Sequence, residues 1–212
     1  MIDSQVSCVA HSADPGRRGL ALRAAWGGVV GPVAFFGAWL VGGTVTRVDY
    51  SPVHDPISRL AAIGADTRGL MSAGFIALGV GVPFYGAALR AAQKDRAWMA
   101  AVATGLATLG VAAAPLGISP AGDTLHGAFA LLGYVSLAAT PLLAARSLCR
   151  GGQRLLGGMG VASSVMTVTS LVLASTTAQR GLFQRVGLTS THLWMAVSAV
   201  VLVRHCAESS RT

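Results

Sequence analysis

Charge-free segments long enough to cross a membrane recur six times along this 212-residue chain. Each lacks Asp, Glu, Lys and Arg, and each is 18 to 26 residues long. They cover residues 24–46, 69–89, 97–122, 124–145, 155–179 and 186–203. A helix needs about 20 apolar residues to cross the hydrocarbon core of a bilayer. The pattern therefore predicts an all-α, polytopic membrane protein built as a bundle of six transmembrane helices.

The composition excludes the competing fold classes. Hydrophobic residues make up 53% of the chain and charged residues only 11%, against about 25% charged residues in a soluble domain. Six soluble helices would need polar outer faces, which these segments lack. A membrane β-barrel would need alternating segments of about ten residues, and these segments are continuous. We expect a cytoplasmic tail over residues 1–24, one transmembrane domain over 25–205 and a C-terminal tail over 206–212, with spans at about 25–46, 69–89, 97–117, 125–145, 155–176 and 188–204.

The net charge of +8 reflects membrane topology rather than nucleic-acid binding. The basic residues stand at the ends of spans instead of forming one patch. With the N-terminus inside, 11 of the 16 Lys and Arg residues fall in cytoplasmic segments, as the positive-inside rule requires. We therefore expect a multi-pass protein of the cell membrane with both termini in the cytoplasm. Its partners are the lipid bilayer and no nucleic acid.

Three of the five histidines are predicted to gather at the outer face. His54 lies in the first outer loop, His126 at the start of the fourth span and His192 at the start of the sixth. Asp123 precedes His126 by three residues, so both share a helix face, and Tyr134 lies about three turns deeper on the same side. Imidazole and carboxylate groups so arranged are candidate ligands of a zinc ion. The simpler alternative is that these are the polar residues expected at helix ends, where Asp123 or Thr124 could cap the span.

The same groups supply the only catalytic candidates in the sequence. His126 would act as a general base, oriented by Asp123, with Ser58 of the first outer loop as a further candidate. The sequence contains no Gly-rich phosphate loop, haem motif or cysteine cluster. We therefore expect no cofactor, with zinc as the alternative, and a non-catalytic protein is favoured over an enzyme.

Arginines on the outer side run against the positive-inside pattern. Arg59, Arg180 and Arg185 could bind the phosphate of a lipid headgroup, because a guanidinium binds phosphate through two parallel hydrogen bonds. Ion pairs with nearby aspartates are the simpler alternative. The segment near 176–190 mixes Arg with Leu, Phe and Val, which predicts a re-entrant or interfacial stretch before the last span.

Hydroxyl side chains recur near one face of the fifth span, at Ser163, Thr167, Ser170 and Thr177. They could line the polar path of a small-molecule facilitator. More often such hydroxyls bond to backbone carbonyls or bridge neighbouring helices. None of the six segments holds a carboxylate, and coupled transporters usually need one near the bilayer midplane. A facilitator or a small channel therefore stays open as a transport function.

Three segments resemble a known family of six-helix bacterial membrane proteins, the domain-of-unknown-function family 998 (DUF998). They are YSPVHDPISRLAAIGA at 50–65, GISPAGDTLHGAFALLGY at 117–134 and GLFQRVGLTSTHLW at 181–194. The resemblance covers residues 26–204 and implies six helices and a membrane location, without an established activity. The residues that match its pattern are Asp55, Ser58, Asp123, His126, Arg185 and Trp194.

A weaker comparison concerns helical membrane hydrolases with a histidine-bound zinc, the alkaline ceramidases and the adiponectin-receptor-like proteins. They use a His-x-x-x-His pair and a Ser-x-x-x-His pair. Here Ala62 stands four residues after Ser58, and Ala196 stands four after His192. We thus expect a protein that binds a lipid or a membrane-protein partner at its outer face. The alternatives are a metal-dependent hydrolase of lipid-like substrates and a small-molecule facilitator.

Overall fold

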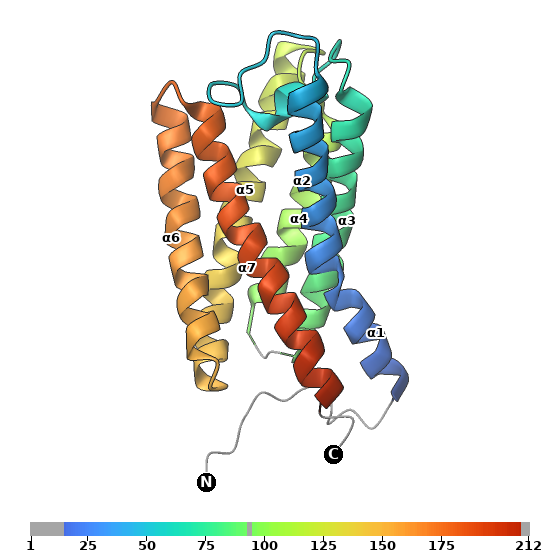
Figure 1. The fold of residues 1–212 in the computed structure, drawn as a ribbon, viewed down its shortest axis with the longest axis vertical. Coiled ribbons are helices and arrows are strands. Elements are labelled where there is room, and N and C mark those ends of the chain that lie inside the picture. Colours follow the sequence, from blue (N-terminus) through green and yellow to red (C-terminus); the bar gives the residue numbers. More distant parts are fainter. Residues whose placement is uncertain (1–14, 93–94, 209–212) are drawn as a thin grey trace.

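Six long helices run along one axis and form a bundle that is capped by a loop at one end (Figure 1). The computed structural model describes residues 15–92 and 95–208, and side chains over 19–92 and 95–204. A shorter helix, α1, precedes the bundle, and a 3-10 helix, η2, lies in the loop. The elements are α1 Pro15–Ala25, α2 Gly27–Val45, η2 Ile57–Ala61, α3 Arg68–Ala92, α4 Ala97–Ala113, α5 Pro120–Arg150, α6 Arg154–Thr176 and α7 Arg180–Glu208.

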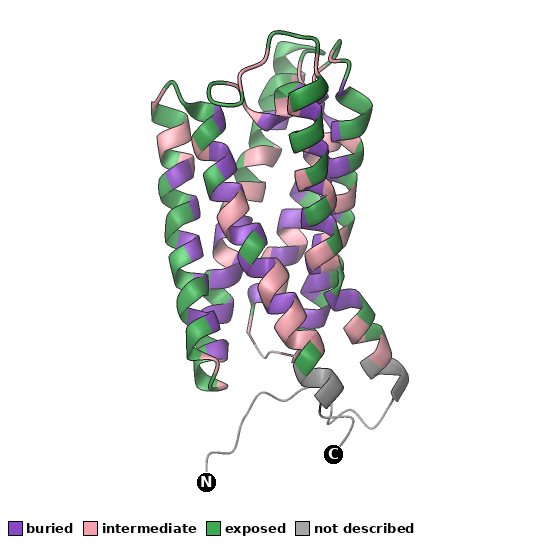
Figure 2. Cartoon of the chain, in the orientation of Figure 1, coloured by how far each residue is buried: buried purple, intermediate pink, exposed green. Residues whose placement is uncertain are grey.

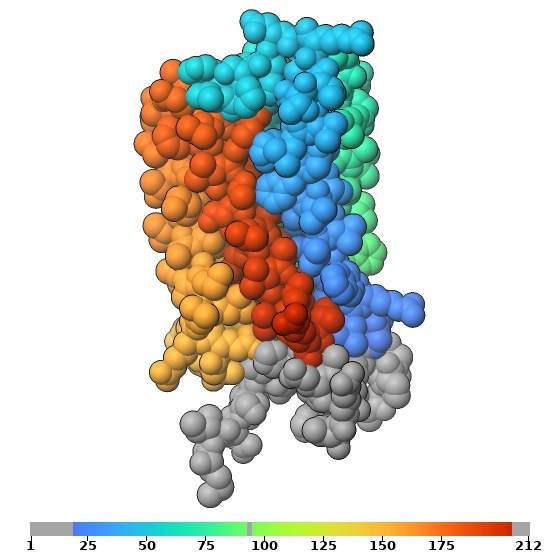
Figure 3. Space-filling model, in the orientation of Figure 1, coloured from blue at the N-terminus to red at the C-terminus, as the bar shows by residue number. Residues whose placement is uncertain are grey.

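Consecutive helices are neighbours in the bundle. Each of α2 to α6 packs extensively on the next helix along the chain, and α7 also contacts α2 and α5. We call the end that carries residues 46–67, 114–119 and 177–179 the loop end. The start of α1 and the end of α7 lie at the opposite end (Figure 1). The loop over residues 46–67 covers the loop end above α2 (Figure 3), and we call it the capping loop.

The length and composition of the helices are those of a membrane bundle. Five helical stretches are long and apolar enough to cross a bilayer, and α4 is a shorter apolar helix. The five are Gly19–Val45, Arg68–Ala92, Pro120–Arg150, Arg154–Thr176 and Arg180–Arg204. The predicted fold class, an all-α polytopic membrane bundle, is confirmed. The predicted span limits and the sidedness of the termini stay predictions.

Large aliphatic residues are exposed on the outside of the bundle, where Figure 2 shows the exposed positions. Leu131 is 63% exposed, Val165 60% and Leu155 80%. Soluble proteins rarely expose such continuous apolar surface. This surface therefore faces lipid, and the buried residues form the seams between helices.

Two segments differ from the sequence-based expectations. The predicted N-terminal tail contains the helix α1 from Pro15 onward, and residues 1–14 lie outside the described part. The predicted re-entrant or interfacial stretch near 176–190 is instead the regular beginning of α7, which starts at Arg180. The helix runs through Arg185 because the guanidinium of that residue finds oxygen partners within the protein.

Small residues set the distance between α2 and α3. A Cβ atom on Gly27 would lie 2.2 Å from the carbonyl oxygen of Gly81, and one on Gly81 would lie 3.0 Å from the Cα of Gly31. Small residues allow such close backbone approach in membrane bundles. The contact therefore tolerates no side chain larger than hydrogen.

We expect Gly27→Ala to lower the stability of the bundle by about 1–3 kcal/mol, the usual cost of overpacking. Gly37→Ala on the same helix is the matched control, because nothing lies within 4 Å of a Cβ at that position. Thermal unfolding in detergent measures both variants. Equal midpoints for the two would contradict the close contact between α2 and α3.

Candidate functional site

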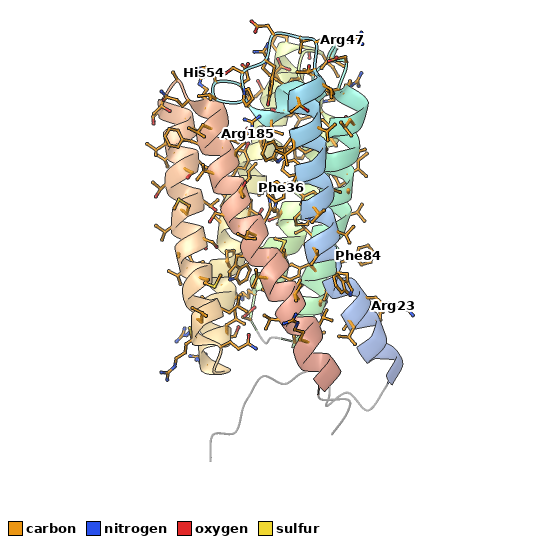
Figure 4. The ribbon with its side chains drawn as sticks, in the orientation of Figure 1. Arg23, Phe36, Arg47, His54, Phe84 and Arg185 are labelled. Carbon is orange, nitrogen blue, oxygen red and sulfur yellow. The ribbon has the colours of Figure 1, made fainter. Side chains whose placement is uncertain are left out.

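Arg185 ties the capping loop to α7. It is only 8% exposed, and its Nη1 donates to the backbone oxygens of Pro52 (2.7 Å), Asp55 (3.1 Å) and Gly181 (2.9 Å). Its Nη2 donates to the hydroxyl of Tyr50. Figure 4 shows Arg185 between α7 and α2, near the loop end. The two Nη groups of this arginine, one of the predicted phosphate ligands, therefore donate to the protein itself, and its buried Nε has no hydrogen-bond partner among the described residues.

Close backbone approach reinforces this anchor. A Cβ on Gly181 would lie 2.3 Å from the backbone oxygen of Asp55 and 2.5 Å from that of Pro52. The guanidinium of Arg185 also lies over the ring of Trp39, 5.2 Å from its centroid. The loop is thus seated directly on the first turns of α7.

Asp55 organises the loop from within. Its carboxylate accepts from the backbone N–H of Ser51 at 2.8 Å and forms an ion pair with Arg59 at 2.5 Å. Burial raises the pKa of this carboxyl, but the hydrogen bond from Ser51 and the contacts with Arg59 outweigh it and hold the pKa below 3.8. Arg59, a second predicted phosphate ligand, is therefore paired with Asp55.

A cavity of about 60 Å³ lies at the centre of the bundle, beneath η2. Four residues that the sequence singles out line it: Ser58, His126, Tyr134 and His192. They come from η2, α5 and α7, which are far apart in the sequence. The remaining lining is mainly apolar and comes from α2, α3, α4, α5, α7 and η2. The bundle thus brings together four of the predicted site residues.

The two histidines of this cavity have different surroundings. The Nδ1 of His126 lies 2.7 Å from the backbone oxygen of Ala114. His192 is 1% exposed, and neither ring nitrogen has a hydrogen-bond partner among the described residues. Its ring packs edge-on against Phe35 and Phe36, with centroids 5.7 and 5.8 Å apart. His192 also lies deeper than predicted, about 18 Å along α7 from Arg180, because that helix starts earlier.

A polar wall bounds the cavity on the side of α5 and α7. The side-chain amide of Gln184 donates to the hydroxyl of Tyr134 and accepts from the backbone N–H of Ile57 at 2.8 Å. Gln184 is therefore hydrogen-bonded at both ends of its amide. The sequence analysis missed this residue because it falls in the segment that was interpreted as interfacial.

An apolar groove of about 910 Å³ lies on the other side of this wall, between α5 and α6. Aliphatic residues such as Leu131, Val165 and Val168 line it, and Arg180 lies at its loop end. Ala130, Tyr134 and Gln184 line both the groove and the central cavity. The side chain of Arg180 has no hydrogen-bond or ion-pair partner in the part of the chain that the structure describes.

The other predicted site residues lie outside the cavity. Asp123 closes the turn before α5 by accepting from the backbone N–H of Gly117 at 2.8 Å. The Nδ1 of His54, on the capping loop, lies 3.0 Å from the backbone oxygen of Ala178. Over the described residues, no three His, Cys, Asp or Glu side chains lie close enough together to hold a metal ion. The zinc alternative stays a prediction.

Three of the four hydroxyls predicted on one face of the fifth span, those of Ser163, Thr167 and Thr177, donate to backbone oxygens. Thr167 donates to the backbone oxygen of Gly187 at 2.8 Å and contacts the hydroxyl of Thr191 at 2.7 Å. Ser163 donates to the oxygen of Gly160 at 3.1 Å. These bonds join α6 to α7 and to its own previous turn. They give no support to a facilitator lined by this face.

We expect Arg185→Lys to destabilise the protein by about 2 kcal/mol, because a lysine ammonium cannot reach the acceptors on both sides of the guanidinium. Arg180→Lys, just over one turn away on α7, is the control. Trypsin cleavage after Arg59, together with thermal unfolding, reports how firmly the loop is held. A loop equally resistant in both variants would contradict the role of Arg185 as an anchor.

Acidification is expected to loosen the same loop. Because the pKa of Asp55 is lower in the folded state, its contribution to stability is complete above the ordinary value of 3.8 and is lost as the pH falls through the folded value. Asp55→Asn should remove that part of the acid sensitivity and weaken the loop near neutral pH. Thermal unfolding of both proteins at a series of pH values tests this. Parallel pH profiles would contradict it.

Comparison with known proteins identifies the family. The family described as "Protein of unknown function (DUF998)" matches residues 29–201, which include all of α3 to α6 and most of α2 and α7. No curated protein and no solved structure matches the chain. The resemblance read from the three loop segments is confirmed. The chain is a multi-pass helical membrane protein, and it belongs to the DUF998 family.

Proposed function

We propose that this protein binds an anionic lipid at the end of the bundle predicted to face away from the cytoplasm. The lipid chain lies in the groove between α5 and α6, and its phosphate binds Arg180. The observation that carries the proposal is the unpartnered arginine at the end of a large apolar groove.

The size and lining of the groove favour a lipid chain. Its volume of about 910 Å³ is at the upper end of the range of small-molecule sites. The walls are aliphatic, and Val168 and Val165 are more than half exposed on the surface that faces lipid. An acyl chain can therefore enter sideways from the bilayer without crossing a polar surface.

The charge at the loop end favours a phosphate. Arg59 is paired with Asp55 and Arg185 is enclosed by loop carbonyls, so Arg180 differs from both in keeping its donors free. A guanidinium recognises a phosphate through two parallel hydrogen bonds. We therefore assign the phosphate to Arg180 alone among the three arginines that the sequence singles out.

The test compares lipid binding by the wild type, Arg180→Gln and Arg47→Gln. Arg47 is an exposed arginine of the capping loop that does not line the groove, so its variant removes the same charge elsewhere. Binding of phosphatidylglycerol and phosphatidylcholine is measured by native mass spectrometry. We expect Arg180→Gln to weaken phosphatidylglycerol binding about tenfold, which corresponds to about 1.4 kcal/mol. Equal losses in both variants would mean general surface attraction and would contradict the site.

A second variant pair tests the groove itself. Val168→Trp should fill the groove and reduce binding of both lipids, because the residue is a wall of the groove. Val33→Trp is the control, since Val33 is a similarly exposed valine on α2 outside the groove. Unchanged binding in Val168→Trp would remove the groove from the proposal.

A further inference from the structure

We infer that the central cavity is a second binding site, which takes the hydroxyl group of an uncharged long-chain alcohol. The alcohol chain extends toward the groove between α5 and α6, with which the cavity shares Ala130, Tyr134 and Gln184 as lining residues. The inference shares the groove with the proposed lipid site, but it does not depend on Arg180.

The first support is the environment of His192. The ring lines the cavity, is almost fully buried, and has two nitrogens without partners among the described residues. Buried polar groups are nearly always hydrogen-bonded, and an unsatisfied one lowers stability. A phenylalanine would suit the contacts with Phe35 and Phe36 equally well. The imidazole therefore points to a role in binding rather than in packing.

The second support is the tautomer of His126. A backbone carbonyl can only accept, so the contact with the oxygen of Ala114 puts the proton on Nδ1. In the neutral ring, Nε2 is then a hydrogen-bond acceptor. The lining thus includes one imidazole, His126, whose neutral form offers an acceptor, and a second, His192, that in its neutral form offers one donor and one acceptor.

One hydroxyl can pair with one nitrogen of each ring. It donates to the Nε2 of His126 while its oxygen accepts from the N–H of His192. An ester carbonyl can only accept, so it leaves the Nε2 of His126 without a donor. The hydroxyl of Ser58, which also lines the cavity, is a further group of the same kind.

The third support is the absence of charge. No Asp, Glu, Lys or Arg is among the residues that line the cavity. A phosphate or an ammonium group would be left without a counter-charge there, at a high desolvation cost. With about 60 Å³, the cavity has room for a hydroxyl and a few carbon atoms. The rest of a longer molecule must lie elsewhere, and the groove shares three wall residues with the cavity.

The experiment compares hexadecanol with its methyl ether, which accepts hydrogen bonds but cannot donate them. Each compound competes with a fluorescent fatty alcohol for binding to the purified protein. We expect the wild type to bind the alcohol at least tenfold more tightly than the ether. In His192→Phe and His126→Phe the difference should fall to less than threefold. Equal binding of the two compounds by the wild type would overturn the inference.

Two controls make the result specific. His54→Phe changes a histidine at the same end of the bundle that does not line the cavity, and it should keep the wild-type preference. The same loss in this variant would overturn the inference. His192→Phe should unfold at the same or a higher temperature than the wild type, since it removes an unpartnered polar group. Arg180→Gln should keep the preference for the alcohol, so failure of the anionic-lipid site would be seen separately.

Discussion

The loop end of this bundle depends on the hydrogen bonds that the guanidinium of Arg185 donates. This guanidinium is buried, and its hydrogen bonds go to neutral oxygens of the loop, of its own helix and of Tyr50. Many donors in one planar group can join several backbone carbonyls, which a lysine could not do. The loop therefore has a defined position over α7. The seating of η2 follows from it, because the N–H of Ile57 donates to the side chain of Gln184, the residue directly before Arg185 in α7.

The helices could be predicted because lipid selects against charge over each span. The helix α7 begins at Arg180, ahead of the last predicted span at about 188, so it includes two arginines that the charge criterion left outside the apolar region. A charged residue within a membrane helix usually pairs with another charge or with backbone carbonyls. The partners of Arg185 are carbonyls about 130 residues earlier in the chain. Such a pairing leaves no local pattern in the sequence.

Four residues that line the cavity could be singled out from the sequence, but the way in which the fold brings them together could not. Ser58, His126, Tyr134 and His192 stood out because polar side chains are few among apolar spans, and they line one cavity. Gln184 was missed because its importance lies in two contacts with distant residues. The groove could not be predicted either, because aliphatic residues of α5 and α6 have the same composition whether the helices touch or separate. Arg180 was selected for its charge, and only the structure distinguishes it from the paired Arg59 and the enclosed Arg185.

A charged group and a neutral hydrogen-bonding group stand little more than one helical turn apart on α7. Arg180 and Gln184 lie four residues apart on α7, so they face the same side, and the charged residue stands at the groove mouth while the amide stands at the wall. Behind that wall the lining carries no charge, and the surrounding low dielectric strengthens each hydrogen bond that is made. Leaving a polar group unpaired there costs about 1–3 kcal/mol. His192 is buried against two phenylalanines, and packing elsewhere in the bundle must offset this cost. A bundle that keeps an imidazole under those conditions gives up stability at that position, and sites of this kind are where binding is usually found.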